Sequence, residues 1–225
     1  MLCGAFFGSE GMARTVLCGK AVASMTICRR FLSASTSVAQ QEARLREELA
    51  AAHLLQVRYS LDDLVWNHLS ARCPWAPERF LVTPGNKLFD EIDPNDLVVV
   101  DTAANDRGSH NVTANVIHAA FYESRPDVCA VVHNHSRACM SVSCISGGLR
   151  FLTQDSAGFF GQVGYHAWEG LSDDTDEKAS LGRDLGDAHT LVMHNHGVAV
   201  VGNTIGEAWV RNYFLDRICQ VQVSV

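Results

Sequence analysis

The chain has 225 residues, of which 47% are hydrophobic, and it carries a formal net charge of -7 with a sequence pI of about 5.8. This length and apolar content are typical of one globular domain with a short appendage. The acidic balance argues against nucleic acid or an anionic membrane as a partner, and no apolar stretch reaches the roughly 18 residues needed to cross a bilayer.

The first 37 residues differ in composition from the rest of the chain. They contain Arg14, Lys20, Arg29 and Arg30 against one acid, Glu10, together with several Ser and Thr. This composition is typical of a mitochondrial import peptide, and the alternative is a disordered extension or an upstream start. We expect an N-terminal extension at 1–37, a folded domain at 38–225, and a mitochondrial or otherwise cytoplasmic location.

The first predicted elements of the domain are one helix and two strands. Residues 39–60 place Leu45, Leu49 and Leu55 on one face at helical spacing, with charges on the other face. Residues 78–89 and 92–101 are short runs of strand-forming residues with Pro- and Gly-containing turn signals.

The rest of the chain repeats a helix-then-strand pattern. A helix that starts at an Asn111 or Thr113 cap has to stop before Pro126, and it leads into a strand at 128–133. The later elements are a helix at 174–187, strands at 189–194 and 198–202 around the turn 195–197, and a closing helix at 204–222. Thr204 and Glu207 have the spacing of a capping box for that last helix. These elements predict a sheet with helices on both faces, and the short turn requires at least one antiparallel strand pair.

Two His-Asn-His triplets follow apolar strand-like runs, at 133–135 and 194–196. Alternate side chains of a strand share a face, so His133 and His135 point the same way and can chelate a metal. A third imidazole from His194 or His196 would complete a three-histidine site with an open position, the arrangement that suits catalytic zinc. A buried, hydrogen-bonded histidine is the commoner reading of any one triplet.

Five segments resemble, in order, the class II aldolase/adducin head domain family. They are WNHLSAR, FLVTPGNKLFDEIDPNDLVVVD, NVIHAAFYESRPDVCAVVHNHS, GYHAWEG and HNHGVAVVGNTIGEAW, and the resemblance covers roughly residues 40 to 222. It implies a three-layer α/β/α sandwich with a mixed, mostly antiparallel sheet, and assembly as a homotetramer. It also implies that zinc or another divalent metal is held by His133, His135 and His196, which leaves His194 as a packing residue or a support for the ligands.

The chain departs from the aldolase members of that family. The resemblance implies a catalytic Glu four positions before His118, where this sequence has Ala114. A methyl group cannot transfer protons, so another group has to act as the base. Asp155 and Tyr165 are the candidates, although Asp often caps turns and Tyr often packs. The pairs that the resemblance aligns with a phosphate pocket, Asn67-His68 and Val112-Thr113, also differ, which argues against a phosphorylated substrate.

These features leave two functional hypotheses. The first is a metal-dependent carbon–carbon lyase, aldolase-like or decarboxylase-like, that acts on a small hydroxy-carbonyl substrate. The second is a non-catalytic, adducin-like interaction module that keeps the metal site and binds a cytoskeletal partner. Retention of all three histidines favours the first hypothesis, and loss of the Glu favours the second.

Overall fold

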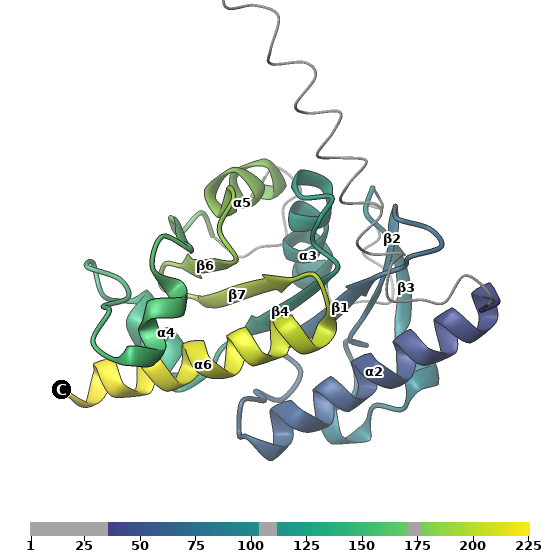
Figure 1. Cartoon of the computed structure of the whole chain (residues 1–225), viewed down its shortest axis with the longest axis horizontal. Coiled ribbons are helices and arrows are strands. Elements are labelled where there is room, and N and C mark those ends of the chain that lie inside the picture. The colour runs from purple at the N-terminus through teal and green to yellow at the C-terminus, as the bar shows by residue number, and fades with distance from the viewer. Residues whose placement is uncertain (1–35, 104–111, 171–176) are drawn as a thin grey trace, which may run out of the picture.

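The computed structural model describes residues 36–103, 112–170 and 177–225. Most of the extension expected at 1–37 lies outside these residues, and the mitochondrial location stays a prediction. Within the described residues the centre of the fold is one seven-stranded sheet with the order β3-β2-β1-β4-β7-β6-β5 (Figure 1). The strands are β1 (His68–Arg72), β2 (Arg79–Val82), β3 (Val98–Asp101), β4 (Ala130–Asn134), β5 (Val163–His166), β6 (Thr190–Met193) and β7 (Gly197–Gly202).

All strand pairs are antiparallel except β5 with β6, which is parallel. The expected mixed, mostly antiparallel sheet is therefore confirmed. The tight turn between β6 and β7 gives the antiparallel pair that the sequence required, whereas the parallel β5–β6 pair is joined through helix α5.

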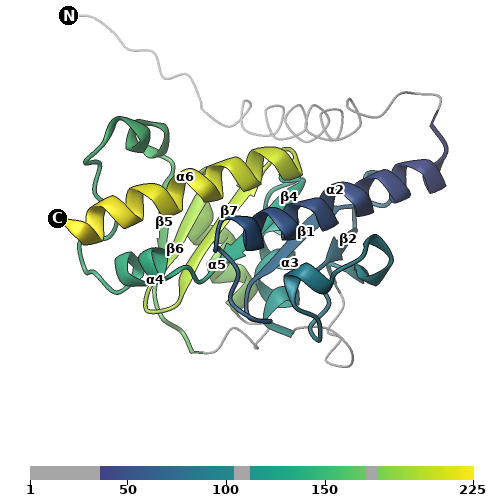
Figure 2. The same ribbon diagram turned by 90° about the horizontal axis from the view of Figure 1, so that it is seen from below.

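Helices cover both faces of the sheet, as expected (Figures 1 and 2). One face packs against α3 (Val112–Ser124) and α5 (Glu177–Leu185). The other packs against α2 (Val38–Arg58), α4 (Arg137–Ser143) and α6 (Ile205–Ser224). Successive side chains of a strand point to opposite faces of the sheet, so alternate residues of one strand pack against different helical layers. In β4, Val131 packs on the α3 and α5 side, while Ala130 and Val132 pack on the α2 side.

The helix boundaries follow from local capping. The Ser37 side chain accepts a hydrogen bond from Gln40 N–H, and the Gln40 side-chain oxygen accepts one from Ser37 N–H, so α2 begins with a complete capping box. Helix α6 begins at the predicted Thr204 cap, but the Glu207 carboxylate accepts from Asn203 N–H, one residue before the expected partner. The predicted strand at 92–101 is shortened to β3, because Pro94–Asp96 forms a 3-10 turn.

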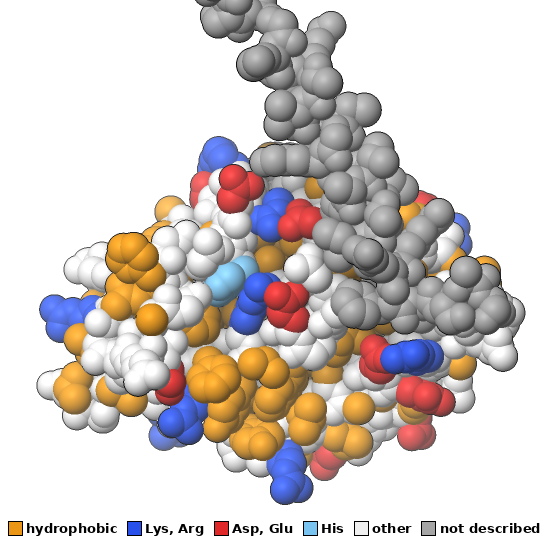
Figure 3. Space-filling model, viewed as in Figure 1, with side chains coloured by type: hydrophobic (Ala, Val, Ile, Leu, Met, Phe, Trp, Pro, Cys, Tyr) orange, Lys and Arg blue, Asp and Glu red, His pale blue; other side chains and the backbone are white. Residues whose placement is uncertain are grey.

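Among the described residues, no helix is both long enough and apolar enough to cross a membrane. The outer surface of α6 nevertheless carries hydrophobic side chains, and Figure 3 shows them gathered along this helix. Val210 and Phe214 are 48% and 38% exposed. The chain therefore presents an apolar strip on a surface that is otherwise mixed in polarity.

Buried His53 on α2 makes stability depend on pH. Its Nδ1–H donates to the Leu49 carbonyl and its Nε2 lies 2.8 Å from Thr83 Oγ1, and burial lowers its pKa to about 4. In the unfolded chain a histidine has a pKa near 6.5, so the unfolded state takes up the proton first as pH falls. The stability is complete above about pH 6.5, and we expect a loss of about 3 kcal/mol by pH 4 from this one group.

Substitution of His53 by Gln keeps the size and hydrogen-bonding capacity of the side chain but removes its titration. The measurement is the free energy of unfolding in urea at pH 7 and at pH 4, for the wild type and for His53→Gln. We expect the variant to lose less stability than the wild type over this interval. Equal losses would contradict the low pKa of His53. The comparison is made as a difference because burial also lowers the pKa of His118, to about 3.

Candidate metal centre

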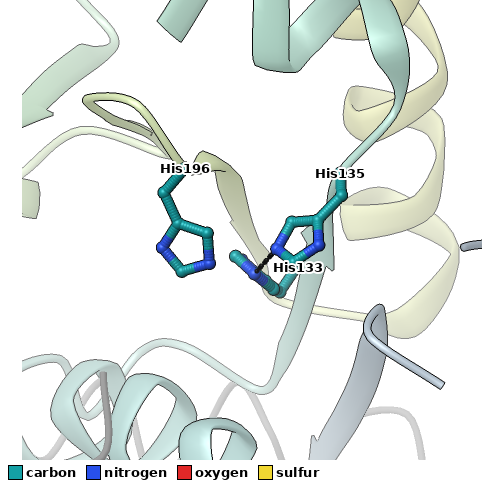
Figure 4. A group of neighbouring side chains, drawn as sticks. All are labelled: His133, His135 and His196. Atoms are coloured by element: carbon teal, nitrogen blue, oxygen red, sulfur yellow. Dashed lines mark hydrogen bonds between the residues drawn. The ribbon is translucent and has the colours of Figure 1, made fainter. Parts of the chain in front are cut away.

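The first two histidines of the site come from the end of β4. His133 is the fourth residue of the strand, and His135 follows its last residue, Asn134. The alternation predicted from the sequence holds here, since the Asn134 amide donates to Asn212 on α6 while the two imidazoles meet on the other side. The Nε2 atoms of His133 and His135 are 2.7 Å apart (Figure 4).

The third histidine comes from the turn between β6 and β7. His196 closes this turn with its N–H on the Met193 carbonyl, and its ring centroid lies 4.9 Å from those of both His133 and His135. Gly197 allows this approach, because a Cβ at that position would stand 2.7 Å from the Asn134 carbonyl oxygen and 2.8 Å from the His135 ring. The glycine of the "HG" pair thus brings β7 close against the end of β4.

The three side chains fit a divalent metal such as zinc. One nitrogen from each of His133, His135 and His196 lies within 4.8 Å of the other two. Burial lowers the pKa of all three, that of His196 to about 4, so the imidazoles are neutral at physiological pH, as ligation requires. His133 is fully buried and the other two are half-buried, which leaves one side of the cluster accessible.

Neighbouring groups hold His135 in place. Asp63 Oδ2 lies 3.6 Å from His135 Nδ1, the position from which a carboxylate orients a metal-binding imidazole. The Asn67 side chain accepts a hydrogen bond from His135 N–H and donates one to the Leu61 carbonyl. Both ends of the Asn67 amide are therefore used within the protein.

His194 stands apart from the cluster. Its N–H donates to the His166 carbonyl, its Nδ1 lies 3.1 Å from the Ser143 carbonyl oxygen, and its ring stacks on Tyr165. Asn195 has a φ of 58°, a left-handed conformation that breaks the alternation of the strand. The side chains of His194 and His196 consequently point in different directions, and His194 packs on Tyr165.

Two further histidines lie beside the centre, and sequence reasoning missed them. His68 on β1 pairs in register with His133, and their rings stack with centroids 4.6 Å apart. His118 on α3 lies behind it, with Nε2 2.6 Å from His68 Nδ1. The available signal was the alternation of His68, Ser70 and Arg72 along a fully buried strand, which places three polar side chains on one inner face.

Ala114 lies on α3, one helical turn before His118, and is completely buried. It belongs to the hydrophobic cluster formed with Phe80 and Ile117. The face of α3 that looks toward the histidines therefore carries a methyl group and an imidazole where the family resemblance implies a carboxylate.

The two proposed catalytic residues occupy different surroundings. Asp155 is in the 3-10 segment Gln154–Phe159 and lies 3.8 Å from Arg217 of α6. Tyr165 is on β5, where its hydroxyl accepts a hydrogen bond from Leu149 N–H and its ring stacks on His194. Tyr165 thus connects to the turn that carries His196, whereas the contacts of Asp155 are with α6.

A second group of ligand-type side chains joins β5 to α5. His166 Nδ1 lies 2.8 Å from Asp184, and its Nε2 lies 3.2 Å from Glu177. Glu169 completes the group and accepts a hydrogen bond from the Ser180 hydroxyl. Each of these side chains has a protein partner, so we interpret the group as a hydrogen-bonded network that connects α5 to β5.

Comparison with known proteins places these features in context. Residues 47–223 match the family model described as the Class II Aldolase and Adducin N-terminal domain. A Pseudomonas aeruginosa protein assigned to the class 2 aldolases is 36% identical over 190 residues, which cover 83% of this chain and 73% of that protein. Alpha-adducin of Rattus norvegicus is 33% identical over 201 residues, which cover 85% of this chain but only 27% of alpha-adducin.

Solved structures give the same picture of the fold. An aldolase II superfamily protein from Pseudomonas syringae superposes with a TM-score of 0.77 at 34% identity, covering 87% of this chain and 79% of that one. An L-fuculose 1-phosphate aldolase from Glaciozyma antarctica superposes with a TM-score of 0.75 at 27% identity, covering 89% and 80%.

Proposed function

This chain belongs to the class II aldolase and adducin N-terminal domain family, and from that premise we propose that it is a metal-dependent carbon–carbon lyase. Its substrate is a small hydroxy-carbonyl compound, and its metal is zinc or another divalent ion bound by His133, His135 and His196. The observation that carries the proposal is the convergence of these three neutral imidazoles, which come from segments about 60 residues apart.

The residues around the cluster support a lyase. When bound, the metal supplies Lewis acidity that polarises a substrate carbonyl. The Asn67 amide holds the backbone of His135, and Asp63 lies 3.6 Å from His135 Nδ1, on the side from which a carboxylate can orient a ligand imidazole. The Asn67 amide already accepts from His135 N–H and donates to the Leu61 carbonyl, so these protein contacts set its orientation in place of a substrate phosphate. This supports a substrate without a phosphoryl group.

The proposed mechanism also requires a group that transfers protons. Ala114 cannot act as a base, and Asp155 and Tyr165 remain the candidates predicted from the sequence. Tyr165 is partly exposed and its ring stacks on His194, two residues before His196, whereas Asp155 lies 3.8 Å from Arg217 of α6. A tyrosine hydroxyl can also donate a proton when the carbon–carbon bond breaks.

One observation favours a second function. Ala114 occupies the position of the family glutamate, and alpha-adducin is among the relatives of similar identity. On this reading the domain is a non-catalytic, adducin-like module that retains the histidines and binds a cytoskeletal partner. The two functions differ in one measurable property, which is turnover by the metal-loaded protein.

The test is a screen of zinc-loaded wild type against small hydroxy- and keto-acids. We expect cleavage or decarboxylation of at least one of these compounds. We also expect His196→Ala to lower kcat/KM by at least about a hundredfold, because loss of a metal ligand has a larger effect than loss of a residue that only orients a ligand. His189→Ala is the matched control, since this partly buried histidine contacts Gly158 and Thr190 away from the cluster. No turnover by a metal-loaded wild type would support the module instead.

We also propose that the chain forms a homo-oligomer, a tetramer by family resemblance. The hydrophobic strip on α6 supports association, because exposed apolar side chains of this kind often mark interfaces. Light scattering on the purified chain measures the assembled mass against 24.6 kDa for one chain. A monomer at working concentration would contradict this proposal.

A further inference from the structure

A chain of hydrogen bonds runs through the core from β1 to α3 and ends at the metal centre. The Tyr122 hydroxyl lies 2.7 Å from Ser70 Oγ, which in turn contacts His118 Nδ1. His118 Nε2 then lies 2.6 Å from His68 Nδ1. All four side chains are buried, so each of their polar atoms depends on the others for hydrogen bonds.

The last nitrogen of this chain has no partner among the described residues. His68 Nε2 is buried and makes no hydrogen bond, although its ring is stacked on that of His133 with an angle of 20° between the planes. Nε2 lies on the side of the ring away from Nδ1, which faces His118. A buried nitrogen without a partner, beside a ligand of the proposed metal, requires an explanation.

The positions of the protons can be worked out along the chain. If the Tyr122 hydroxyl donates to Ser70, Ser70 donates to His118 Nδ1, and His118 Nε2–H donates to His68 Nδ1, every hydroxyl proton has an acceptor. In the opposite direction His68 Nδ1–H donates to His118, His118 donates to Ser70, and Ser70 donates to Tyr122. The Tyr122 proton then has no acceptor and His68 Nε2 has no donor among the described residues, so two buried atoms are left unsatisfied, whereas the first direction leaves only the Nε2–H of His68.

The first direction is therefore favoured, and it fixes the tautomer of the last imidazole. In this direction each imidazole uses one ring nitrogen as an acceptor, so its other ring nitrogen carries the proton. With Nδ1 accepting from His118, the proton of His68 has to be on Nε2. The chain consequently ends in one N–H group that is without an acceptor beside the three-histidine cluster.

We propose that His68 presents this Nε2–H as a neutral hydrogen-bond donor to a carboxylate or carbonyl oxygen of the ligand bound at the three-histidine centre. Ser70 and His118 are positioning residues that hold the donor tautomer, and Tyr122 supplies a hydrogen bond to the Ser70 oxygen. A preorganised donor of this kind stabilises negative charge that develops on a substrate oxygen. The choice of ligand rests on the proposed function, whereas the tautomer does not.

The tautomer is tested by 15N NMR of histidine-labelled full chain before metal is added. We expect the proton of His68 on Nε2, with the resonance assigned by its disappearance in His68→Gln. Tyr122→Phe should keep this tautomer, because Ser70 still donates to His118. Ser70→Ala removes the donor to His118 and should give a mixture of tautomers. A proton on Nδ1 of His68 in the wild type would overturn the inference, whatever metal the protein binds.

The donor is tested by calorimetric titration of the zinc-loaded chain with oxalate, a small dicarboxylate. His68→Phe keeps an aromatic ring against His133 but has no N–H, and we expect it to bind oxalate at least about tenfold more weakly at equal zinc content. His68→Gln, which keeps an N–H donor, should recover part of the affinity. Equal affinity in all three proteins would overturn the inference. If the wild type takes up no zinc, the proposed function is contradicted, and so is the claim that His68 donates to a ligand of the metal centre. The tautomer measured without metal would be unaffected.

Discussion

A double variant, His133→Ala with His135→Ala, is expected to lose the divalent metal that the wild type carries at about one per chain. The two Nε2 atoms are 2.7 Å apart, so they serve one ion, and the variant keeps only His196 of the three ligands. Structural zinc sites in zinc-finger peptides are worth about 10 kcal/mol or more, and a single imidazole cannot hold the ion against dialysis. The measurement is metal content of the purified protein by elemental analysis after dialysis against a weak chelator.

The control for this experiment has to separate loss of ligands from loss of fold. His133 is completely buried, and its removal leaves a cavity that destabilises the core by itself. A second double variant, His189→Ala with His194→Ala, removes two imidazoles outside the cluster. Circular dichroism and thermal melting of both variants establish that they are folded. If the first variant is folded and keeps its full metal content, the assignment of the ligands is wrong.

The helices were predictable because their signals are local. In α2, the spacing of Leu45 and Leu49 and the polar residues between them are contained within a few turns, and the Ser37 cap is adjacent. The end of α3 follows from Pro126, which disfavours helical geometry in the residue before it. The local pattern is also sufficient for the pair His133 and His135, since strand alternation alone puts both rings on one face.

The surroundings of the metal centre were not predictable, because they depend on pairing between distant strands. His68 meets His133 only because β1 lies next to β4 in the register that places these two residues opposite each other. Sequence separation gives no indication of that register, which is set by burial of both faces of the sheet. The hydrogen-bonded chain behind His68 adds α3 to the same contact, so three separate segments have to be placed before it becomes visible.

The choice between His194 and His196 shows a different limit. Simple alternation would place both residues on one face, and the sequence left their roles to be separated by family resemblance. The separation comes from the backbone of Asn195, whose positive φ turns the chain between them. Asn adopts this conformation more readily than most residues, so the Asn-His-Gly sequence carries a signal for the turn but none for which imidazole faces the cluster.

A final prediction concerns the family position on α3. Ala114→Glu is expected to lower the stability of the metal-free chain by about 3 kcal/mol or more, because Ala114 is fully buried among hydrophobic side chains. The larger side chain overpacks the core, and burial among these hydrophobic side chains disfavours an ionised carboxylate. Since residue 114 is one turn before His118, whose ring contacts His68 beside His133, the new carboxylate is on the side of the helix that faces the metal centre.

Added zinc should therefore stabilise Ala114→Glu more than it stabilises the wild type, because the metal supplies the missing positive charge and gains an anionic ligand. Ala114→Gln is the matched control, with the same size and no charge. The measurements are the melting temperature of each protein with and without zinc, and the zinc affinity by competition with a chromogenic chelator. If Glu and Gln respond equally to zinc, residue 114 does not face the metal. Turnover by Ala114→Glu then decides between the two functions. If the chain is a lyase, the new carboxylate should add aldol-type cleavage of hydroxy-carbonyl substrates. If it is an interaction module, the variant should bind zinc more tightly and show no turnover.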